Sequence, residues 1–315
     1  MQKRELGKSG LKIAPLVFGG NVFGWTVDER TSFALLDGFT GAGCNCIDTA
    51  DIYSAWVPGH KGGESETIIG KWLKQRGRRD EVVILTKLGF SRKDEGGVLT
   101  RKRILEDVEA SLKRLQTDYI DLYQSHTDDK TTPIEETLEA YQQLINQGKV
   151  RSVGASNYET ARLADALKIS DEKKLPRYQS LQPLYNLADR AGFERDLEAL
   201  CLKENIGVIP YYSLAAGFLT GKYREESDFA GAARAARVKT YFDDRGKRIL
   251  KALDDVAAQL GVKPVHVALA WLAARPAVTA PIASATNLGQ LEDLIVGVRL
   301  KLNAAVIKTL DAASA

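Results

Sequence analysis

Short apolar runs alternate along the chain with longer segments in which apolar residues recur every three or four positions. The short runs have the length of buried strands, and the spacing of the longer segments is typical of amphipathic helices. Strands that alternate with such helices predict right-handed βαβ units and a parallel sheet. The predicted strands span residues 16–20, 44–48, 82–87, 119–126, 150–157, 178–182, 207–212 and 279–284, and the clearest helices span 65–76, 100–115, 134–147, 158–169 and 193–204.

Eight such units predict an α/β fold of the (β/α)8 TIM-barrel type. Residues 4–14 have the pattern of an N-terminal β-hairpin, and a short helix is expected at the C-terminus. The competing fold is a doubly wound nucleotide-binding sheet, which carries a GxGxxG turn after its first strand. The first strand here runs into FGGNVFGW, which lacks that spacing. We find no linker or low-complexity tract, so residues 1–315 are expected to form one domain.

Residues 225–242 are the least regular part of the pattern, and we expect them to form a long loop. Loops of this length in compact domains are often functional lids.

Composition narrows the function classes. Lysine and arginine total 44 against 41 aspartate and glutamate residues, spread along the chain, so there is no electrostatic footprint for nucleic acid. No run of about 18 apolar residues occurs, which predicts a cytoplasmic protein without a membrane segment. The three cysteines are expected to be buried thiols rather than metal ligands or redox centres. The oligomeric state is not defined by the sequence.

Polar residues stand where the predicted strands end. In a βα barrel the C-terminal strand ends converge on one face, which carries the active site. These residues are therefore expected to be neighbours in space: Asp48, Lys87, His126, Ser156, Asn157, Gln182, Tyr211 and Ser284.

Asp48, Tyr53, Lys87 and His126 combine into a plausible catalytic set. A lysine ammonium beside a tyrosine favours the phenolate, so we expect Lys87 to lower the Tyr53 pKa and make it a usable acid or base. Asp48 would hold Lys87 charged and aimed. His126 would donate a hydrogen bond to a substrate carbonyl.

Each of the four also has an ordinary structural role: a lysine at a strand end often snorkels, and a lone histidine or aspartate often serves packing or capping. Their occurrence together at consecutive strand ends favours catalysis. His266 lies on a helical pattern and is interpreted as structural, and His60 as a loop residue without assigned chemistry.

The segments DTADIYS, ILTKLG and DLYQSH around these residues resemble the aldo-keto reductases, and in particular their bacterial and potassium-channel β-subunit side. GESETIIGKWL, GASNY, LQPLYN, GFLTGKY and SATNLGQLED extend the resemblance to about residue 298. It implies a barrel that binds an extended nicotinamide dinucleotide without a Rossmann domain. It also implies reversible reduction of an aldehyde, ketone or sugar-like carbonyl, with Tyr53 as proton donor and hydride from the nicotinamide C4.

The same resemblance implies a set of cofactor contacts. Gly20, Asn21 and Asp48 would lie beside the cofactor, Ser156, Asn157 and Gln182 would hold the carboxamide, and Tyr211 would stack on the nicotinamide. The pyrophosphate loop would be formed by Tyr212, Ser213, Leu214, Ala215 and Gly217, with Lys222 and either Arg234 or Arg237 on the phosphates. The adenosine end would lie against Ser284, Ala285, Thr286, Gln290 and Asp293.

The adenosine end departs most from the family pattern. Ser284 and Gln290 stand where well-known reductases carry basic residues, and Leu294 replaces a common asparagine. A hydroxyl binds a 2′-phosphate less strongly than a bidentate arginine does. With Lys222 and a loop arginine the sequence still favours NADP, and NAD stays possible.

On the substrate side, Phe23, Trp25 and Trp56 are expected to form an aromatic wall, with packing alone as the competing interpretation. The chain ends too soon after its last helix for a long closing loop, which predicts an open pocket for a small carbonyl compound. Two other functions remain open. One is a cofactor-loaded redox-sensing subunit with slow catalysis, and the other is a Schiff-base reaction at Lys87.

Overall fold

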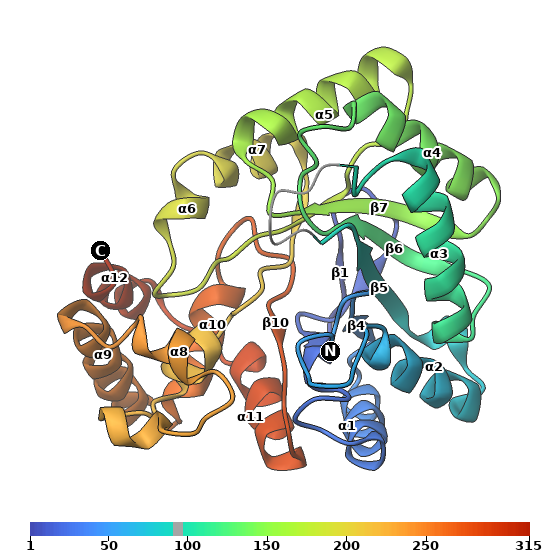
Figure 1. Cartoon of the computed structure of the whole chain (residues 1–315). Coiled ribbons are helices and arrows are strands. Elements are labelled where there is room, and N and C mark those ends of the chain that lie inside the picture. The colour runs from blue at the N-terminus through green and yellow to red at the C-terminus, as the bar shows by residue number, and fades with distance from the viewer. Residues whose placement is uncertain (91–96) are drawn as a thin grey trace.

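Eight parallel strands form the centre of the computed structural model, which describes residues 1–90 and 97–315 (Figure 1). Their order is β10-β3-β4-β5-β6-β7-β8-β9. The amides of Thr279 and Ile282 donate to the carbonyls of Val208 (2.8 Å) and Pro210 (3.0 Å), which closes the sheet. The strands are β3 (Val17–Gly19), β4 (Cys46–Asp48), β5 (Val83–Leu88), β6 (Ile120–Ser125), β7 (Val150–Ser156), β8 (Ser180–Gln182), β9 (Gly207–Val208) and β10 (Ile282–Ala283). The predicted (β/α)8 barrel is confirmed.

Helices surround the strands (Figure 1). They are α1 (Glu29–Gly41), α2 (Glu64–Arg76), α3 (Arg101–Leu115), α4 (Ile134–Asn146), α5 (Thr160–Lys173), α6 (Ala191–Glu194), α7 (Leu197–Glu204), α8 (Ala235–Lys239), α9 (Asp244–Leu260), α10 (Pro264–Ala273), α11 (Leu288–Arg299) and α12 (Ala304–Ala313). Local chemistry sets their ends: the Thr100 hydroxyl accepts from Arg103 N at the start of α3, and Gln116 ends it in a left-handed conformation. The helix predicted over 193–204 is instead two helices, because Asp196 leaves the helical region (φ −140°).

The N-terminal hairpin closes one end of the barrel. Strands β1 (Arg4–Glu5) and β2 (Lys12–Ile13) pair antiparallel, as predicted. Leu6, Leu11 and Ile13 are buried with the apolar residues inside the barrel, such as Leu85. The turn needs glycine at position 7, where φ is +59° and a Cβ would lie 2.1 Å from the Gln179 carbonyl oxygen.

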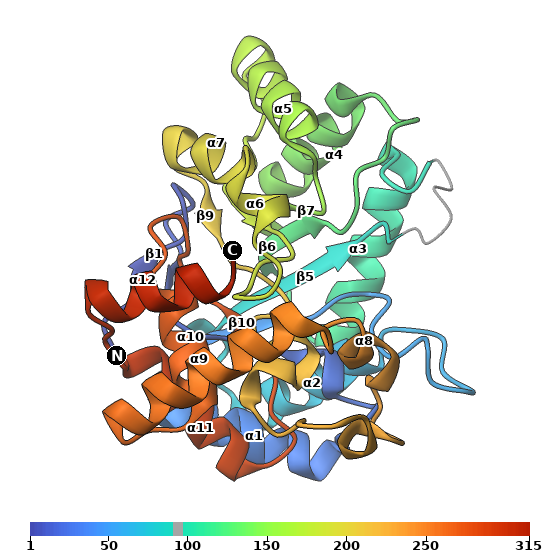
Figure 2. The same cartoon turned by 90° about the vertical axis from the view of Figure 1, so that its left-hand side faces the viewer.

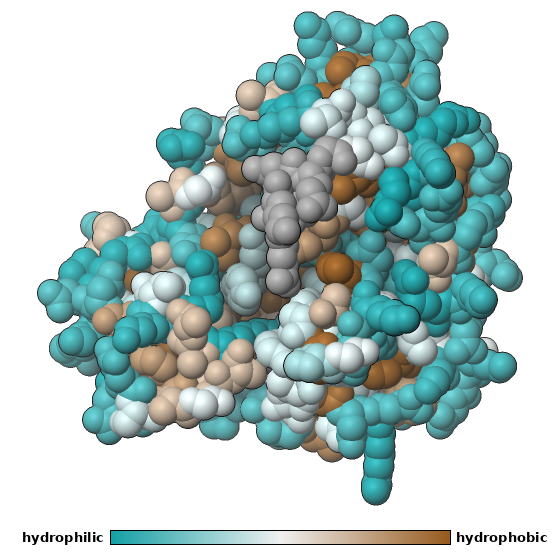
Figure 3. Space-filling view, viewed as in Figure 1, coloured by the Kyte–Doolittle hydropathy of each residue, from teal (hydrophilic) through white to brown (hydrophobic). Residues whose placement is uncertain are grey.

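A larger core lies between the barrel and its helices. The C-terminal helix α12, which the sequence predicted, packs against α9 (Figure 2). Within the described residues no single helix has the length and apolar run needed to cross a membrane; α9 and α10 reach it only as a pair bent by 99°. Polar residues cover most of the rim of the face seen in Figure 1, and apolar residues show nearer its centre (Figure 3).

Residues 225–242 correct one prediction. They are not an irregular loop, because they contain the 3-10 turn η4 (Glu226–Phe229) and helix α8. Phe229, Val238 and Tyr241 are buried and fix the segment to the core. The segment therefore has regular structure and is packed against the rest of the protein through these three side chains.

Candidate active site

The four predicted catalytic residues meet at the C-terminal ends of three neighbouring strands. Asp48 ends β4 and Lys87 lies near the end of β5, and the Lys87 Nζ is 2.8 Å from both carboxylate oxygens of Asp48. The Tyr53 hydroxyl donates to Asp48 Oδ2 at 3.2 Å. The ring of His126, just beyond β6, lies 6.1 Å from the Tyr53 ring. The parallel register of the strands produces this convergence.

Lys87 is fully buried and its ammonium has three acceptors. Besides the two oxygens of Asp48, its Nζ donates to the Thr49 carbonyl at 2.6 Å. Burial lowers the pKa of Lys87, and the Asp48 carboxylate opposes that shift. Three donors matched by three acceptors are the geometry of a charged ammonium.

The Tyr53 pKa differs from our expectation. Burial raises it well above its usual value, and the Asp48 carboxylate, which accepts the hydroxyl proton, raises it further. Lys87 does not reach the phenol oxygen by a hydrogen bond; its Nζ lies 4.7 Å from the Tyr53 ring centroid. The prediction of a lowered pKa is wrong for this arrangement because Asp48, not Lys87, contacts the hydroxyl. Tyr53 is therefore held in its protonated form.

His126 is neutral near physiological pH. Burial lowers its pKa well below the usual value, and the Lys87 charge acts in the same direction. Its Nδ1 is buried without a hydrogen-bond partner among the described residues. A neutral imidazole can still donate one hydrogen bond to a carbonyl oxygen.

The residues predicted to hold a carboxamide surround this set. Gln182 Nε2 donates to Asp48 Oδ1 at 2.9 Å, and Ser156 Oγ donates to the Gln182 carbonyl at 2.8 Å. Asn157, in a left-handed conformation (φ +57°), donates to the His126 carbonyl and accepts from the Tyr211 hydroxyl at 2.8 Å. Gly20 lies against the same site, because a Cβ there would be 3.0 Å from the Asp48 carbonyl oxygen.

The predicted pyrophosphate loop has an unusual backbone. Tyr212, Ala215, Ala216 and Gly217 all have positive φ. Successive turns of this kind aim amides at one point and make an anion-binding concavity. The N–H groups of Ser213 and Leu214 donate to no backbone acceptor within residues 1–90 and 97–315. The Ser213 hydroxyl is turned inward to the Pro210 carbonyl, so only the backbone of Ser213 is available.

Cations lie around this loop. Lys222 is exposed, and its Cε is 3.5 Å from the position of a Cβ on Gly217. Arg237 is 3.8 Å from Asp189 and bonds the Tyr241 hydroxyl. Arg234 lies against Trp25 and Tyr212. Amide donors backed by three cations fit the phosphates of a dinucleotide.

The adenosine-end residues are only partly brought together. Ser284 Oγ contacts Asn21 Oδ1 at 2.7 Å, which joins β10 to the loop after β3, and Ala285 is buried. Gln290 accepts from the amide and hydroxyl of Thr286. Asp293 is engaged elsewhere: Lys263 and His266 hold its carboxylate at 2.8 and 2.9 Å. That contact agrees with the structural role predicted for His266.

Of the three residues predicted to form an aromatic wall, only Trp25 and Trp56 lie together near Tyr53. Trp25 and Trp56 make an edge-on pair at 5.5 Å, and Trp56 lies 6.0 Å from the Tyr53 ring. Phe23 corrects the prediction, because it is fully buried and stacks on Phe18 at 5.3 Å in the core.

Comparison with known proteins decides the family. The model of the aldo/keto reductase family matches residues 15–315. The chain belongs to the aldo/keto reductase family. It is 34% identical over 318 residues to the uncharacterized oxidoreductase YrpG of Bacillus subtilis, covering 99% of this chain and 95% of that protein.

Two further relatives mark the breadth of the family. Protein tas of Escherichia coli is 32% identical over 337 residues, covering 99% of this chain and 97% of tas. A probable voltage-gated potassium channel subunit beta of Arabidopsis thaliana is 34% identical over 303 residues, covering 93% and 90% of the two chains. Members of this family generally use nicotinamide cofactors, so membership supports NAD(P)H-dependent oxidoreduction.

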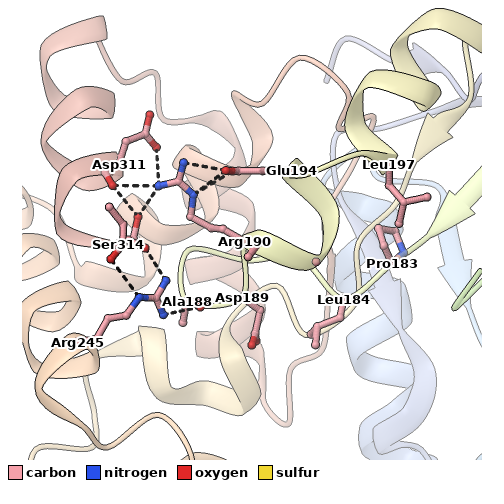
Figure 4. Close-up of a pocket in the computed structure, with 13 residues that line it drawn as sticks. Pro183, Leu184, Ala188, Asp189, Arg190, Glu194, Leu197, Arg245, Asp311 and Ser314 are labelled. Atoms are coloured by element: carbon pink, nitrogen blue, oxygen red, sulfur yellow. Dashed lines mark hydrogen bonds and ion pairs between the residues drawn. The ribbon is translucent and has the colours of Figure 1, made fainter. Parts of the chain in front are cut away.

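The aldo/keto reductase barrel also has a cavity of about 740 Å³ outside the catalytic set, beside the C-terminal residues. Two arginines donate hydrogen bonds to the C-terminal residues there (Figure 4). Arg190 donates to Ser314 Oγ and to the Asp311 carbonyl, and Arg245 donates to the Ser314 carbonyl. The catalytic residues do not line it. The contacts fix α12 to the barrel.

Sequence reasoning missed Asp51, whose backbone contacts that of Lys87. Its amide donates to the Lys87 carbonyl at 3.1 Å, and its Oδ1 is buried without a partner among the described residues. Burial raises the pKa of its carboxyl to about 7, and Glu66 and Asp107 push it further in the same direction. Its position in DTADIYS gave no signal, because the buried neighbours come from two other helices, α2 and α3.

Asp51→Asn is expected to stabilise the protein at high pH. Its folded pKa lies above the unfolded value of about 3.9, so the wild type loses stability as the pH rises from about 4 to about 7, while the asparagine does not. We expect the free energy of unfolding at pH 8 to rise by about 4 kcal/mol, at about 1.4 kcal/mol for each of about three pKa units, and the difference to vanish near pH 4. Urea denaturation at both pH values measures this, and a difference independent of pH would contradict it.

Proposed function

We propose that this protein reduces an aldehyde, ketone or sugar-like carbonyl to the alcohol, reversibly and with NADPH, within a single domain of residues 1–315. The observation that carries the proposal is the hydrogen-bonded set of Lys87, Asp48 and Tyr53, with neutral His126 beside it. When bound, the dinucleotide would supply hydride from its nicotinamide C4.

Four residues of the chain would supply the proton, stabilise the charge that its loss leaves, and orient the carbonyl. Tyr53, protonated because its pKa is raised, gives its proton to the carbonyl oxygen. Lys87 places a positive charge beside the phenolate that this step leaves, so it stabilises the transition state more than the ground state. Asp48 aims Lys87, and His126 donates a hydrogen bond that fixes the direction of the carbonyl.

Residues around the site would hold the cofactor. The pyrophosphate would lie on the predicted loop of Tyr212, Ser213, Leu214, Ala215 and Gly217, with Lys222 and Arg237 as countercharges. The amides of Ser213 and Leu214 are the donors open to it, because those of Ala215 and Gly217 already donate to the carbonyls of Tyr212 and Leu214. Preference for NADP over NAD would rest on these cations and on the hydroxyls of Ser284 and Thr286. Asp293 is the weakest member of the predicted set, because Lys263 and His266 already occupy its carboxylate.

A redox-sensing subunit with slow catalysis is the second candidate. The relatives named as potassium channel β-subunits favour it. The intact catalytic set favours turnover. A Schiff base at Lys87 is disfavoured, because a nucleophilic amine must be neutral and the three acceptors around Nζ suit an ammonium.

Titration of the purified protein with NADPH and with NADH, followed by cofactor fluorescence, tests the proposal. We expect tighter binding of NADPH, and loss of its fluorescence when 4-methylbenzaldehyde is added, because hydride leaves the cofactor. Binding without oxidation across a panel of aldehydes, ketones and sugars would favour the sensor. Binding of neither cofactor would overturn both candidates.

A further inference from the structure

Asn186 is a fully buried side chain whose hydrogen-bonding capacity is completely used. Its Nδ2 donates to Asp189 Oδ2 at 2.9 Å and to the Tyr212 carbonyl at 3.0 Å. Its Oδ1 accepts from the amides of Ala188 at 2.7 Å and Asp189 at 2.9 Å. A side-chain amide offers two donors and two acceptor positions, and all of them have partners here. A buried polar network that is satisfied in this way is rigid.

The bond to Tyr212 joins two loops of the barrel. Asn186 lies in the loop that follows β8, and Tyr212 lies in the loop that follows β9. The turn that contains Asn186 is itself held in place, because Arg245 of α9 donates to the Ala188 carbonyl at 2.8 Å. The Asn186 side chain is therefore a fixed support for the second loop.

The carbonyl that Asn186 holds belongs to the peptide between Tyr212 and Ser213. This carbonyl also accepts from the Ala215 amide at 2.7 Å, so two donors fix its direction. In a planar trans peptide the N–H and the C=O point in opposite directions, so the Ser213 N–H is directed away from Asn186. Tyr212 has a φ of +52°, and such a conformation persists in a residue other than glycine when its surroundings hold it.

We propose that Asn186 is a positioning residue for the cofactor, which sets the affinity for the dinucleotide by fixing the direction of the Ser213 N–H. That amide is one of the two open donors of the predicted pyrophosphate loop. The inference rests on the proposed function and adds to it a residue outside both the loop and the catalytic set. Asn186 acts through this peptide alone, because its own polar atoms are occupied by other parts of the chain.

Asn186→Thr and Asn186→Ser test this inference, and either variant is sufficient if it folds. The hydroxyl is one bond shorter than the amide, so it can accept from an amide of its own turn without reaching the Tyr212 carbonyl. We expect the Kd of the preferred dinucleotide, NADPH or NADH, to rise about 10- to 100-fold in a fluorescence titration, the range for a hydrogen bond to a charged group. At saturating cofactor kcat should change less than about threefold, because the catalytic set is untouched.

Asn45→Ser is the matched control. Asn45 is also a buried asparagine that joins two backbone segments, beside the N-terminal hairpin. Its Nδ2 donates to the Lys12 carbonyl at 3.0 Å, and its Oδ1 accepts from the Ala14 amide at 2.9 Å. The variant should lose free energy of unfolding in urea as the Asn186 variants do, and keep the Kd of the dinucleotide within about twofold.

Hydrogen exchange in the protein without cofactor gives a second readout. Residues 211–217 should exchange faster in the Asn186 variants, because the loop has lost its support, and at the wild-type rate in Asn45→Ser. Mass spectrometry of peptides from this segment measures the exchange. Wild-type exchange in a folded Asn186 variant would show that the loop does not depend on Asn186.

The titrations separate the inference from the proposed function. An Asn186 variant that binds the dinucleotide as tightly as the wild type would overturn the inference, and the proposed function would stand. Equal losses of affinity in the Asn186 and Asn45 variants, or a kcat that falls as far as the affinity, would also overturn it, because either result marks a general loss of structure. A wild type that binds neither NADPH nor NADH would overturn both.

Discussion

Tyr53→Phe is expected to lower kcat/KM for aldehyde reduction by about 10²- to 10⁴-fold, the range that a positioned general acid contributes. The phenylalanine keeps the ring that contacts Trp56 and His126 and removes only the hydroxyl that donates to Asp48. Because the proton is needed only in the transition state, NADPH affinity should stay within about twofold. Steady-state NADPH oxidation and a fluorescence titration measure the two quantities.

The control for this variant is Tyr119→Phe. Tyr119 lies just before β6, at the opposite end of the strand from His126, where Arg79 packs on its ring at 4.1 Å. Its loss of one hydroxyl should leave kcat/KM unchanged. Retained turnover in Tyr53→Phe would remove Tyr53 from its role as the acid.

Lys87→Met is expected both to lower kcat sharply and to destabilise the fold. The substitution leaves the Asp48 carboxylate buried without its cation, and breaking a buried ion pair in this way costs about 3–5 kcal/mol. It also removes the charge that would stabilise the Tyr53 phenolate, so kcat should fall by at least about 10²-fold. Urea denaturation and NADPH oxidation measure the two effects.

The double variant Asp48→Asn, Lys87→Met separates them. Removing both charges should restore much of the lost free energy of unfolding, because no unpaired ion remains. Turnover should not return with it. A double variant that regains both stability and activity would contradict the electrostatic role of Lys87.

The barrel, and the convergence of the candidate catalytic residues on one face of it, were predictable because both depend on short-range periodicity. The strand runs set the order of the sheet, and a parallel barrel brings Asp48, Lys87 and His126 to one face whatever lies between them in sequence. The ends of the strands were less predictable. The run at 207–212 gives a strand of only Gly207–Val208. Pro210 has no N–H to donate to the sheet, and Tyr212 then takes a positive φ.

The other predictions that were wrong concern the surroundings of single side chains, which are formed by segments distant in sequence. Phe23 looked like a pocket residue beside Trp25, but Phe18 covers it from the strand before. The Tyr53 pKa depends on which of two neighbours contacts the hydroxyl, and sequence spacing does not decide between Asp48 and Lys87.

The measurement that tests the central claim most directly follows one deuterium atom. The protein is incubated in ordinary water with NADPH carrying deuterium in both positions at C4 and with 4-carboxybenzaldehyde, and the alcohol is analysed by mass spectrometry. Direct hydride transfer with Tyr53 supplying a solvent-derived proton predicts one deuterium on the carbinol carbon and none retained on oxygen. An alcohol without deuterium on that carbon, or no alcohol from any aldehyde tested, would contradict the account.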